Sequence, residues 1–431
     1  KMISFKSAIK LGVAATVPML SCQNSAKKPD VRPNIVFILL DDLGYSDIGC
    51  YGSSFYETPN IDRLASEGIR FTSAYASCPV SSPTRASLMT GKYPVNTGIT
   101  EWIPGRQATK HGGPYDKLLA PPFTLKLDTS ELTIAEVLRE NGYKTMISGK
   151  WHLGEDPVYW PEHQGFDINK GGWKAGQPFI SDSSNGFFSP YGNPRLEDGP
   201  VGEYMTDRQT DEALKFISES RDDRFFLYLS YYAVHNPMQA KEEHIDKFRL
   251  KADSIGLSEM NPFTREKDWI RSYMSDDFRE RIIQSNPVYA AMIWSVDENI
   301  GKVVSKLKEL GIYDNTIVIF TSDNGGLATS AGSPTCNYPL RAGKGWLYEG
   351  GIRVPLIIKD PDAGRKGMII DIPVSTIDFF PTLADYAGAE IDTSGIDGIS
   401  IVNGYKTGIF PTRPLFWHYP HYNNQGTEPG S

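Results

Sequence analysis

The chain has 431 residues, of which 40% are hydrophobic and 22% charged, and it contains 40 Gly and 30 Pro. This composition is typical of a large, turn-rich globular protein and excludes a disordered or coiled-coil chain. Lys and Arg number 44 against 52 Asp and Glu, so the net charge is −8, and without a block of cations we expect no binding to nucleic acid.

The N-terminal 22 residues have the pattern of a secretion signal. Three lysines precede the apolar run 11–20, which is too short to span a bilayer. The run ends in Leu20-Ser21-Cys22, which resembles a bacterial lipoprotein cleavage box; an ordinary signal peptide with an incidental cysteine is the alternative. We therefore predict a signal peptide over 1–22, a linker over 23–33, and export to the periplasm or lipid anchoring to the envelope of a bacterium. No other apolar stretch is long enough for a membrane span.

Apolar runs after the linker predict buried strands over 35–40, 145–147, 225–231, 316–320 and 354–358. Helical patterns lie between them over 59–67, 131–141, 205–218 and 287–310. The second of these helices has Ser130 as its expected N-cap and stops at Gly142. Strands that alternate with helices predict an α/β fold with a large, mostly parallel sheet sandwiched by helices.

Two stretches do not follow this alternation. Residues 155–203 are crowded with Gly, Pro, Asp and aromatic side chains, and an irregular segment of this length usually serves function. The end of the chain, residues 411–431, follows an apolar-aromatic run and reads as the start of a further element that is cut off. We expect one large catalytic domain over 34–410 and the beginning of a C-terminal subdomain over 411–431.

Polar residues follow four of the predicted strands at the point where each strand ends. Asp41-Asp42 follow the first strand, Ser148 to His152 the second, His235 the third, and Asp323-Asn324 the fourth. In an open parallel sheet the carboxyl ends of the strands form the ligand crevice. Each residue alone has a structural explanation, such as a helix cap or a turn, but four segments together predict one site.

The chemistry of these residues divides into two groups. The first consists of hard oxygen donors suited to calcium or magnesium: Asp41, Asp42, Asp323 and Asn324. The chain has four cysteines without a C-x-x-C and no histidine pair on these loops, so zinc is not expected. The second group is cationic or can become so, which suits a tetrahedral oxyanion such as phosphate or sulfate: Arg85, Lys150, His152, His235 and Lys344.

Residues 79–91, which contain Ser81-Ser82-Pro83-Thr84-Arg85, resemble the first sulfatase signature with its (C/S)-x-P-x-R centre. Residues 142–152 resemble the second signature, and Asp323 to Gly326 and 344–355 resemble later landmarks. The likeness runs in order from about residue 33 to 420, so the chain resembles a type I, formylglycine-dependent sulfatase. It implies the alkaline phosphatase-like fold, with a small C-terminal antiparallel-sheet subdomain that is truncated here.

The resemblance implies that Ser81 is oxidised to formylglycine, whose hydrate attacks sulfur to give a sulfo-enzyme intermediate and then expels sulfate. It also implies one calcium ion bound by Asp41, Asp42, Ser81, Asp323 and Asn324. Serine in place of the commoner cysteine implies an anaerobic, radical-type maturation enzyme as a partner, or an engineered Cys→Ser change. From the residues themselves, we expect Pro83 to fix the turn that presents Ser81 and Thr84 to cap the helix that follows.

The remaining roles follow by position in the family. Arg85, together with the metal, would lower the pKa of the hydrate, and Lys150 and Lys344 would bind sulfate oxygens. His235 would protonate the leaving sugar oxygen. His152 would orient the hydrate and take its proton during sulfate release.

The expected substrate is a sulfated carbohydrate of host or algal origin, of the galactose or N-acetylgalactosamine type. Aromatic faces pack against sugar C–H surfaces, and the candidate contacts are Trp102, Arg106, His111, Trp173, His418 and His421. Two alternatives stay open. One is a phosphonate or phosphate ester hydrolase of the same superfamily. The other is a glycan-binding form without activity, because Ser81 was never oxidised.

Overall fold

The computed structural model describes residues 32–106, 118–264, 279–329 and 332–422. The expected signal peptide, nearly all of the expected linker, His111 and residues 423–431 lie outside the described residues. The contacts group the chain from Arg32 onward into one unit. Within the described part of this unit, no helix has both the length and the apolarity needed to cross a bilayer.

The centre of this unit is an eight-stranded sheet. Its strands, in spatial order, are β11 (Met368–Ile370), β2 (Ile69–Phe71), β10 (Leu356–Lys359), β9 (Thr316–Ser322), β1 (Asn34–Leu40), β8 (Phe225–Ser230), β4 (Lys144–Gly149) and β5 (Ile168–Lys170). Only β10 runs antiparallel to its neighbours β9 and β2; every other pair is parallel. The predicted large, mostly parallel sheet is therefore confirmed, and four of the predicted strands are its central ones.

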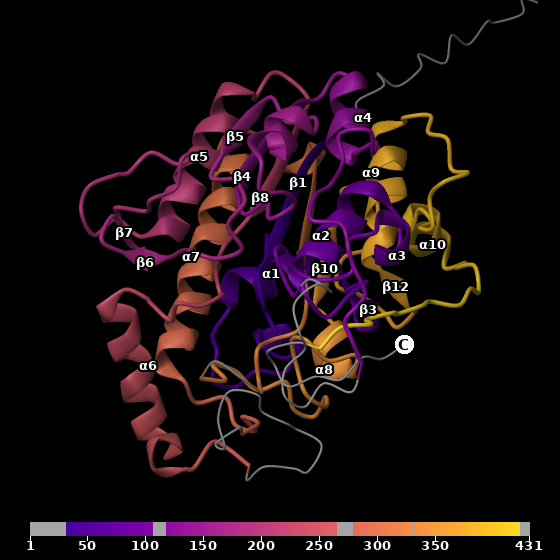
Figure 1. The fold of residues 1–431 in the computed structure, drawn as a ribbon. Helices are drawn as coiled ribbons and strands as arrows, with labels where there is room; N and C mark the ends of the chain where they lie inside the picture. Colours follow the sequence, from indigo (N-terminus) through magenta and orange to yellow (C-terminus); the bar gives the residue numbers. More distant parts are fainter. Residues whose placement is uncertain (1–31, 107–117, 265–278, 330–331, 423–431) are drawn as a thin grey trace, which may run out of the picture. The chain divides into compact units, whose positions relative to one another are not determined.

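Helices cover both faces of the sheet because its central strands are apolar on both sides. In β1, Val36, Ile38 and Leu40 belong to one buried cluster, and the alternate residues belong to the other. The first cluster includes residues of α1 (Pro59–Glu67), α5 (Met205–Glu219), α6 (Glu242–Ser254) and α7 (Pro287–Glu309). The second includes residues of α2 (Ser81–Thr90), α4 (Ile134–Glu140), α9 (Phe379–Ala387) and α10 (Val402–Thr407). Figure 1 shows α5 and α7 on one side of the sheet and α2, α4 and α9 on the other.

Short elements fill the connections. They are the helices α3 (Pro94–Thr97) and α8 (Glu349–Ile352), the pair β3 (Ala74–Tyr75) with β12 (Val374–Ser375), and the pair β6 (Ile180–Ser181) with β7 (Ser184–Asn185). Single 3₁₀ turns lie at Gly49–Tyr51, Pro157–Tyr159, Pro161–His163, Leu257–Glu259, Tyr313–Asn315 and Thr376–Asp378. Besides the edge strand β5, the described elements of the stretch 155–203 are such short pieces, as its composition indicates.

The start of α4 differs from the sequence-based expectation. The N-cap is Thr133 and not Ser130: the Glu136 amide donates to Thr133 Oγ1 at 3.2 Å, and the Thr133 amide donates to Glu136 Oε2 at 2.8 Å. This reciprocal pair is a capping box. The hydroxyl of Ser130 instead donates to Asp128 Oδ1 at 3.0 Å.

Candidate active site

The carboxyl ends of β9, β1, β8 and β4 lie side by side, since these four strands are adjacent and parallel. They deliver Asp323, Asp41, His235 and Lys150 to one edge of the sheet. Lys344 reaches the same edge because it precedes β10, which runs in the opposite direction. The structure therefore brings together the polar residues that follow the predicted strands.

Ser81 is the first residue of α2 and is 2% exposed. Its hydroxyl donates to Asp41 Oδ1 at 3.1 Å and lies 3.5 Å from Asn324 Oδ1, while Lys150 Nζ donates to Ser81 Oγ at 3.1 Å. The expectation for Thr84 is wrong. Its hydroxyl donates back to the carbonyl oxygens of Cys78 and Val80 at 2.9 and 3.2 Å and does not cap α2.

Three buried carboxylates are matched by three buried cations. Lys150 Nζ donates to both oxygens of Asp41 at 2.9 and 2.8 Å. Lys344 Nζ donates to Asp42 Oδ2 at 2.8 Å. Arg85 holds Asp323 Oδ2 through Nε at 2.9 Å and Nη2 at 2.8 Å. Burial of a charge costs much less when the charge is paired and hydrogen-bonded, so this pairing offsets part of the cost of burying side chains that are at most 9% exposed.

The protonation of these groups follows from burial and pairing. Burial alone would raise the pKa of the Asp41 and Asp42 carboxyls, but Lys150 beside Asp41 and Lys344 beside Asp42 hold both pKa values below their usual range. Burial also lowers the pKa of Lys150 to about 8, although Asp41 favours its charged form. The pKa of Lys344 is raised because its carboxylate neighbours outweigh its burial.

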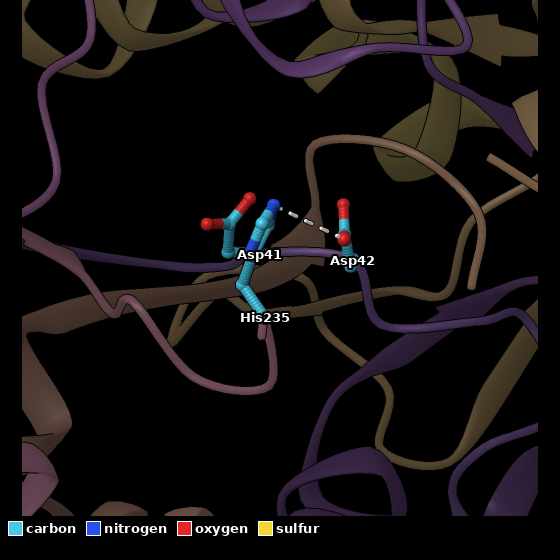
Figure 2. Close-up of side chains that lie close together, drawn as sticks. All are labelled: Asp41, Asp42 and His235. Atoms are coloured by element: carbon cyan, nitrogen blue, oxygen red, sulfur yellow. Dashed lines mark ion pairs between the residues drawn. The ribbon is translucent and has the colours of Figure 1, made fainter. Parts of the chain in front are cut away.

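The acidic cluster can hold a metal ion. Atoms of Asp41, Asp42 and His235 lie within 4.8 Å of one another, and Figure 2 shows these side chains converging. His235 Nε2 is 3.5 Å from Asp42 Oδ2 but accepts a hydrogen bond from Lys344 Nζ at 2.9 Å. Most of the candidate ligands are oxygens, since each carboxylate offers two lone-pair-bearing oxygens, and Asn324 Oδ1 and Ser81 Oγ add two more. An oxygen set of this kind fits a hard cation.

Two residues of the site have left-handed backbone conformations that glycine normally adopts. Asp42 has a φ of 63° and His152 a φ of 62°, which cost about 1–3 kcal/mol each for such residues. The imidazole of His152 is 4% exposed; its Nε2–H donates to the carbonyl oxygen of Ile103 at 2.5 Å. Its Nδ1 has no hydrogen-bond partner among the described residues, so Nδ1 carries the lone pair. Burial and Lys150 hold the pKa of His152 well below its usual value.

Two glycines of the sequence landmarks permit close backbone approach at this edge. A Cβ on Gly149, whose φ is +114°, would lie 1.9 Å from the carbonyl oxygen of Ser230. A Cβ on Gly325 would lie 1.8 Å from the carbonyl oxygen of Gly350. The landmark segments at 323–326 and 344–355 are therefore in direct contact, and a side chain at Gly325 would separate them, whereas one at Gly149 would push the end of β4 from Ser230.

A cavity of about 400 Å³ opens onto the site. Five of its lining residues belong to the predicted catalytic set: Ser81, Lys150, His152, His235 and Lys344. The wall contains Trp102 and residues 174–177 together with Phe179. The irregular stretch 155–203 thus supplies part of the cavity wall.

Some of the candidate substrate contacts line a cavity, and others do not. Trp102 lines the cavity, and Trp173 lines an adjacent crevice of about 30 Å³. Arg106 and His418 are not among the described residues that line either space, and His111 lies outside the described residues. His421 is 1% exposed, with Nε2 at 2.8 Å from the hydroxyl of Thr100, so it is a packed residue and not a surface contact.

Sequence reasoning missed Ser230, Lys174 and Phe179. Arg85 Nη1 donates to Ser230 Oγ at 2.7 Å, and that hydroxyl donates to the carbonyl oxygen of Lys150 at 2.8 Å. Ser230 is the last residue of β8 and lies within the predicted strand 225–231, where it could have been found as a further polar residue near the sheet edge. Lys174 and Phe179 are exposed and line the cavity, and no periodic pattern distinguishes them within the irregular stretch.

Comparisons with known proteins agree with this geometry. Residues 33–389 match the family model described as Sulfatase. The chain is 31% identical over 411 residues to N-acetylgalactosamine-6-sulfatase of Mus musculus, covering 90% of this chain and 68% of that protein. It is 28% identical over 493 residues to a sulfatase of Formosa agariphila, covering 100% of this chain and 83% of that protein.

Among solved structures, the crystal structure of Ps i-CgsB in complex with k-i-k-neocarrahexaose is similar, with a TM-score of 0.67 and 32% identity. The match covers 87% of this chain and 76% of that one. The chain therefore belongs to the sulfatase family, as its two signatures indicate, and it is a sulfuric ester hydrolase.

Proposed function

We propose that this enzyme hydrolyses sulfate esters of a carbohydrate, with a formylglycine formed from Ser81 as the reacting residue and one bound calcium ion. The observation that carries the proposal is the position of Ser81. Its hydroxyl lies where the acidic cluster, Lys150 and the cavity meet, with Asp41 Oδ1 at 3.1 Å and Lys150 Nζ at 3.1 Å. A group attached to Ser81 would face both a metal and the substrate.

The proposed metal ligands are Asp41, Asp42, Asp323 and Asn324, with residue 81 itself as the fifth. Calcium, when bound, supplies positive charge that polarises a sulfate oxygen and the attacking hydroxyl. The oxygen character of the donor set and its burial support this choice. The three carboxylates are already balanced by three cations, so a divalent ion gives the site a surplus of two positive charges, which favours an anionic ester.

The protein's own side chains then have separate roles in binding and catalysis. Lys150 and Lys344 line the cavity and can donate to sulfate oxygens, which offsets charge that builds during transfer. Arg85 lies beside Asp41 and Asp323 and favours the ionised form of the hydroxyl at position 81. His235 presents Nε2 to the cavity, since its Nδ1–H donates to the carbonyl oxygen of Asn236 at 3.0 Å. Once the imidazole is protonated on both nitrogens, His235 can give the Nε2 proton to a leaving oxygen, and His152 Nδ1, which carries a lone pair, is placed to take one.

Three features support a carbohydrate as the substrate. The cavity volume of about 400 Å³ is within the range of small-ligand sites. Its wall contains the aromatic side chains of Trp102 and Phe179, which can pack against sugar faces. The relative described as N-acetylgalactosamine-6-sulfatase and the neighbour bound to a neocarrahexaose are named for carbohydrate ligands.

The proposal includes two steps before catalysis. The pattern over 1–22 supports export to the periplasm or to a lipid-anchored position on the envelope. We expect a maturation enzyme of the radical type to convert the serine at position 81, because oxidation of an alcohol to an aldehyde removes two hydrogens, one of them from carbon. The active form depends on both steps.

The test is expression of the full chain with and without a serine-competent radical maturase. The Ser81 peptide should lose the mass of two hydrogens only with the maturase, and only that form should turn over sulfate esters repeatedly. The unmodified form should still bind a sulfated monosaccharide. Equal turnover by the serine form would remove formylglycine from the proposal, and faster turnover of phosphonate or phosphate esters than of sulfate esters would replace the substrate class.

A further inference from the structure

The loop 100–104 meets the site at three places. The carbonyl oxygen of Ile103 accepts the Nε2–H of His152 at 2.5 Å. The amide of Ile103 donates to the hydroxyl of Ser82 at 3.1 Å, directly after Ser81. Trp102 lines the cavity. The position of this loop therefore determines which nitrogen of His152 faces the site and where the wall of the cavity lies.

A segment distant in sequence, residues 417–421, holds this loop. Tyr419 Oη lies 2.8 Å from both carboxylate oxygens of Glu101 and donates to that group. The same carboxylate accepts the amide of Trp102 at 2.9 Å. A second contact joins Thr100 Oγ1 to His421 Nε2 at 2.8 Å. Glu101 and Tyr419 are each 1% exposed, so water does not replace these bonds.

The ring of Tyr419 also touches the start of the helix that carries Ser81. It forms a buried cluster with Cys78 and Val80, and Trp102 packs against this cluster. Val80 is the residue immediately before Ser81 and is the N-cap of α2. One side chain thus contacts both the segment that presents the reacting residue and the loop that orients His152.

We infer that Tyr419 and Glu101 are positioning residues, which together fix the loop 100–104 so that His152 and Trp102 face the reacting group at position 81. The expected effect on turnover rests on the proposed function, but the expected effect on the position of the loop does not. The hydroxyl of Tyr419 donates to Glu101, and the Glu101 carboxylate accepts the backbone amide of Trp102. Loss of that hydroxyl releases the loop without removing any group that touches the substrate.

The first experiment uses the full-length, matured enzyme with Tyr419→Phe, which keeps the ring and removes the hydroxyl. Displacement of a catalytic group by about 1 Å can cost about a hundredfold in rate, and we expect a fall in kcat/KM of between about tenfold and a hundredfold. The kcat should fall for aryl and sugar sulfates alike, because His152 serves both. The KM should rise for sugar sulfates only, because Trp102 lies where the sugar packs.

The matched control is Tyr405→Phe. Tyr405 is 2% exposed, donates to Asp360 Oδ2 at 2.5 Å and lies on α10, so it is a second buried tyrosine–carboxylate pair away from the cavity. Loss of the Tyr405 hydroxyl should lower the Tm without a change in kcat/KM.

A second pair of variants tests the Glu101 end of the contact. Glu101→Gln retains a hydrogen-bonding group for Tyr419 and Trp102. It should keep most of the kcat/KM that Glu101→Ala loses.

A readout that needs no turnover separates this inference from the proposed function. Diethyl pyrocarbonate modifies accessible imidazole nitrogens, and the mass of the peptide that contains His152 reports its rate. The rate should increase several-fold in Tyr419→Phe and Glu101→Ala and stay at the wild-type value in Tyr405→Phe. Wild-type labelling and wild-type kcat/KM in Tyr419→Phe would overturn the inference, as would equal changes in Tyr405→Phe. If the wild type turns over no sulfate ester, the proposed function fails while the labelling still decides the positioning role.

Discussion

Lys150 joins Asp41 and Ser81 through the three N–H donors of one ammonium group. Its Nζ donates to both oxygens of Asp41 and to the hydroxyl of Ser81. Burial lowers its pKa to about 8 even though Asp41 favours the charged form. A metal ion bound by Asp41 would use the same carboxylate oxygens, and Lys150 would then be left to pair with an anion in the cavity. The residue is therefore suited to hold the site together without substrate and to bind substrate when the metal is present.

The first prediction concerns His235. His235→Ala should reduce turnover of sugar sulfates by about 10²–10⁴, the usual contribution of a general acid, and reduce turnover of aryl sulfates much less. An aryl oxide is a good leaving group and needs little protonation, whereas a sugar alkoxide needs a proton as the bond breaks. Measurement of kcat for wild type and variant on a nitrophenyl sulfate and on a sulfated monosaccharide gives the two losses to be compared. Equal losses on both substrates would exclude His235 as the proton donor.

The second prediction concerns metal binding at Asp323. With calcium about a hundredfold above its Kd, the wild type should be stabilised by about 2.7 kcal/mol, seen as a rise in Tm. Asp323→Asn should lose this calcium-dependent rise, because one charged oxygen of the donor set is removed while the shape of the side chain is kept. Asp314, an exposed acid on a 3₁₀ turn, supplies the control: Asp314→Asn should respond to calcium as the wild type does. A wild-type Tm that does not change when calcium is chelated, or a wild type that retains zinc, would contradict the assignment.

At the residue scale, the sequence predicts the members of the site that follow strands. Asp41, Lys150, His235 and Asp323 can be found because apolar runs locate the strand ends, and a parallel sheet brings those ends together. The contact between Glu101 and Tyr419 spans 318 residues and leaves no local pattern. Such a contact depends on tertiary packing alone, and only the structure reveals it.

At the scale of elements, central strands can be located from a local sequence pattern, whereas edge strands cannot. The central strands β1, β8 and β9 are buried at every position, and this is why they read as continuous apolar runs. The edge strands β5 and β11 have three residues each and are partly exposed. A short, half-exposed strand has neither a continuous run nor a clear alternation, so these strands could not be located from the sequence.

The third prediction tests the start of α4. Thr133→Ala should lower the free energy of unfolding by about 1–2 kcal/mol, the usual cost of losing an N-cap. Its hydroxyl also donates to the carbonyl oxygen of Gln164 at 2.8 Å, which favours the upper end of that range. Ser130→Ala, at the exposed residue that the sequence indicates as the cap, should change stability by less than about 0.5 kcal/mol. Urea denaturation of both variants measures the difference, and equal losses would remove the capping box as the starting signal of the helix.

At the scale of the described unit, the site joins segments from the whole length of the chain. The order β9-β1-β8-β4 places four strand ends in one row, and α2 adds Ser81 from a helix on one face. Residues 417–421 then cover the loop beside the site, with Trp417 Nε1 donating to the carbonyl oxygen of Ala76 at 2.8 Å. Sequence patterns predict the sheet and its edge, but the use of the last described residues to support the site follows from packing that no pattern encodes.

The last prediction concerns acid stability and involves His421. Burial, together with the nearby His418, lowers the pKa of His421 from its usual 6.5 to about 4. Between about pH 6.5 and pH 4 the unfolded chain therefore binds a proton at this residue that the folded protein does not, so stability falls as the pH falls through that window. A pKa shift from 6.5 to about 4 corresponds to a loss of about 2 kcal/mol between pH 6.5 and pH 4.5.

His421→Gln removes this titration while it keeps an amide for the hydroxyl of Thr100. The wild type should lose about 2–3 kcal/mol more free energy of unfolding than His421→Gln between pH 7 and pH 4.5. Urea denaturation of both proteins at the two pH values measures this difference, in which the other titrating groups cancel. His163→Gln, at an exposed histidine, should follow the wild type. An equal loss in wild type and His421→Gln would show that the imidazole is protonated in the folded protein, and that residues 417–421 do not bury it in solution.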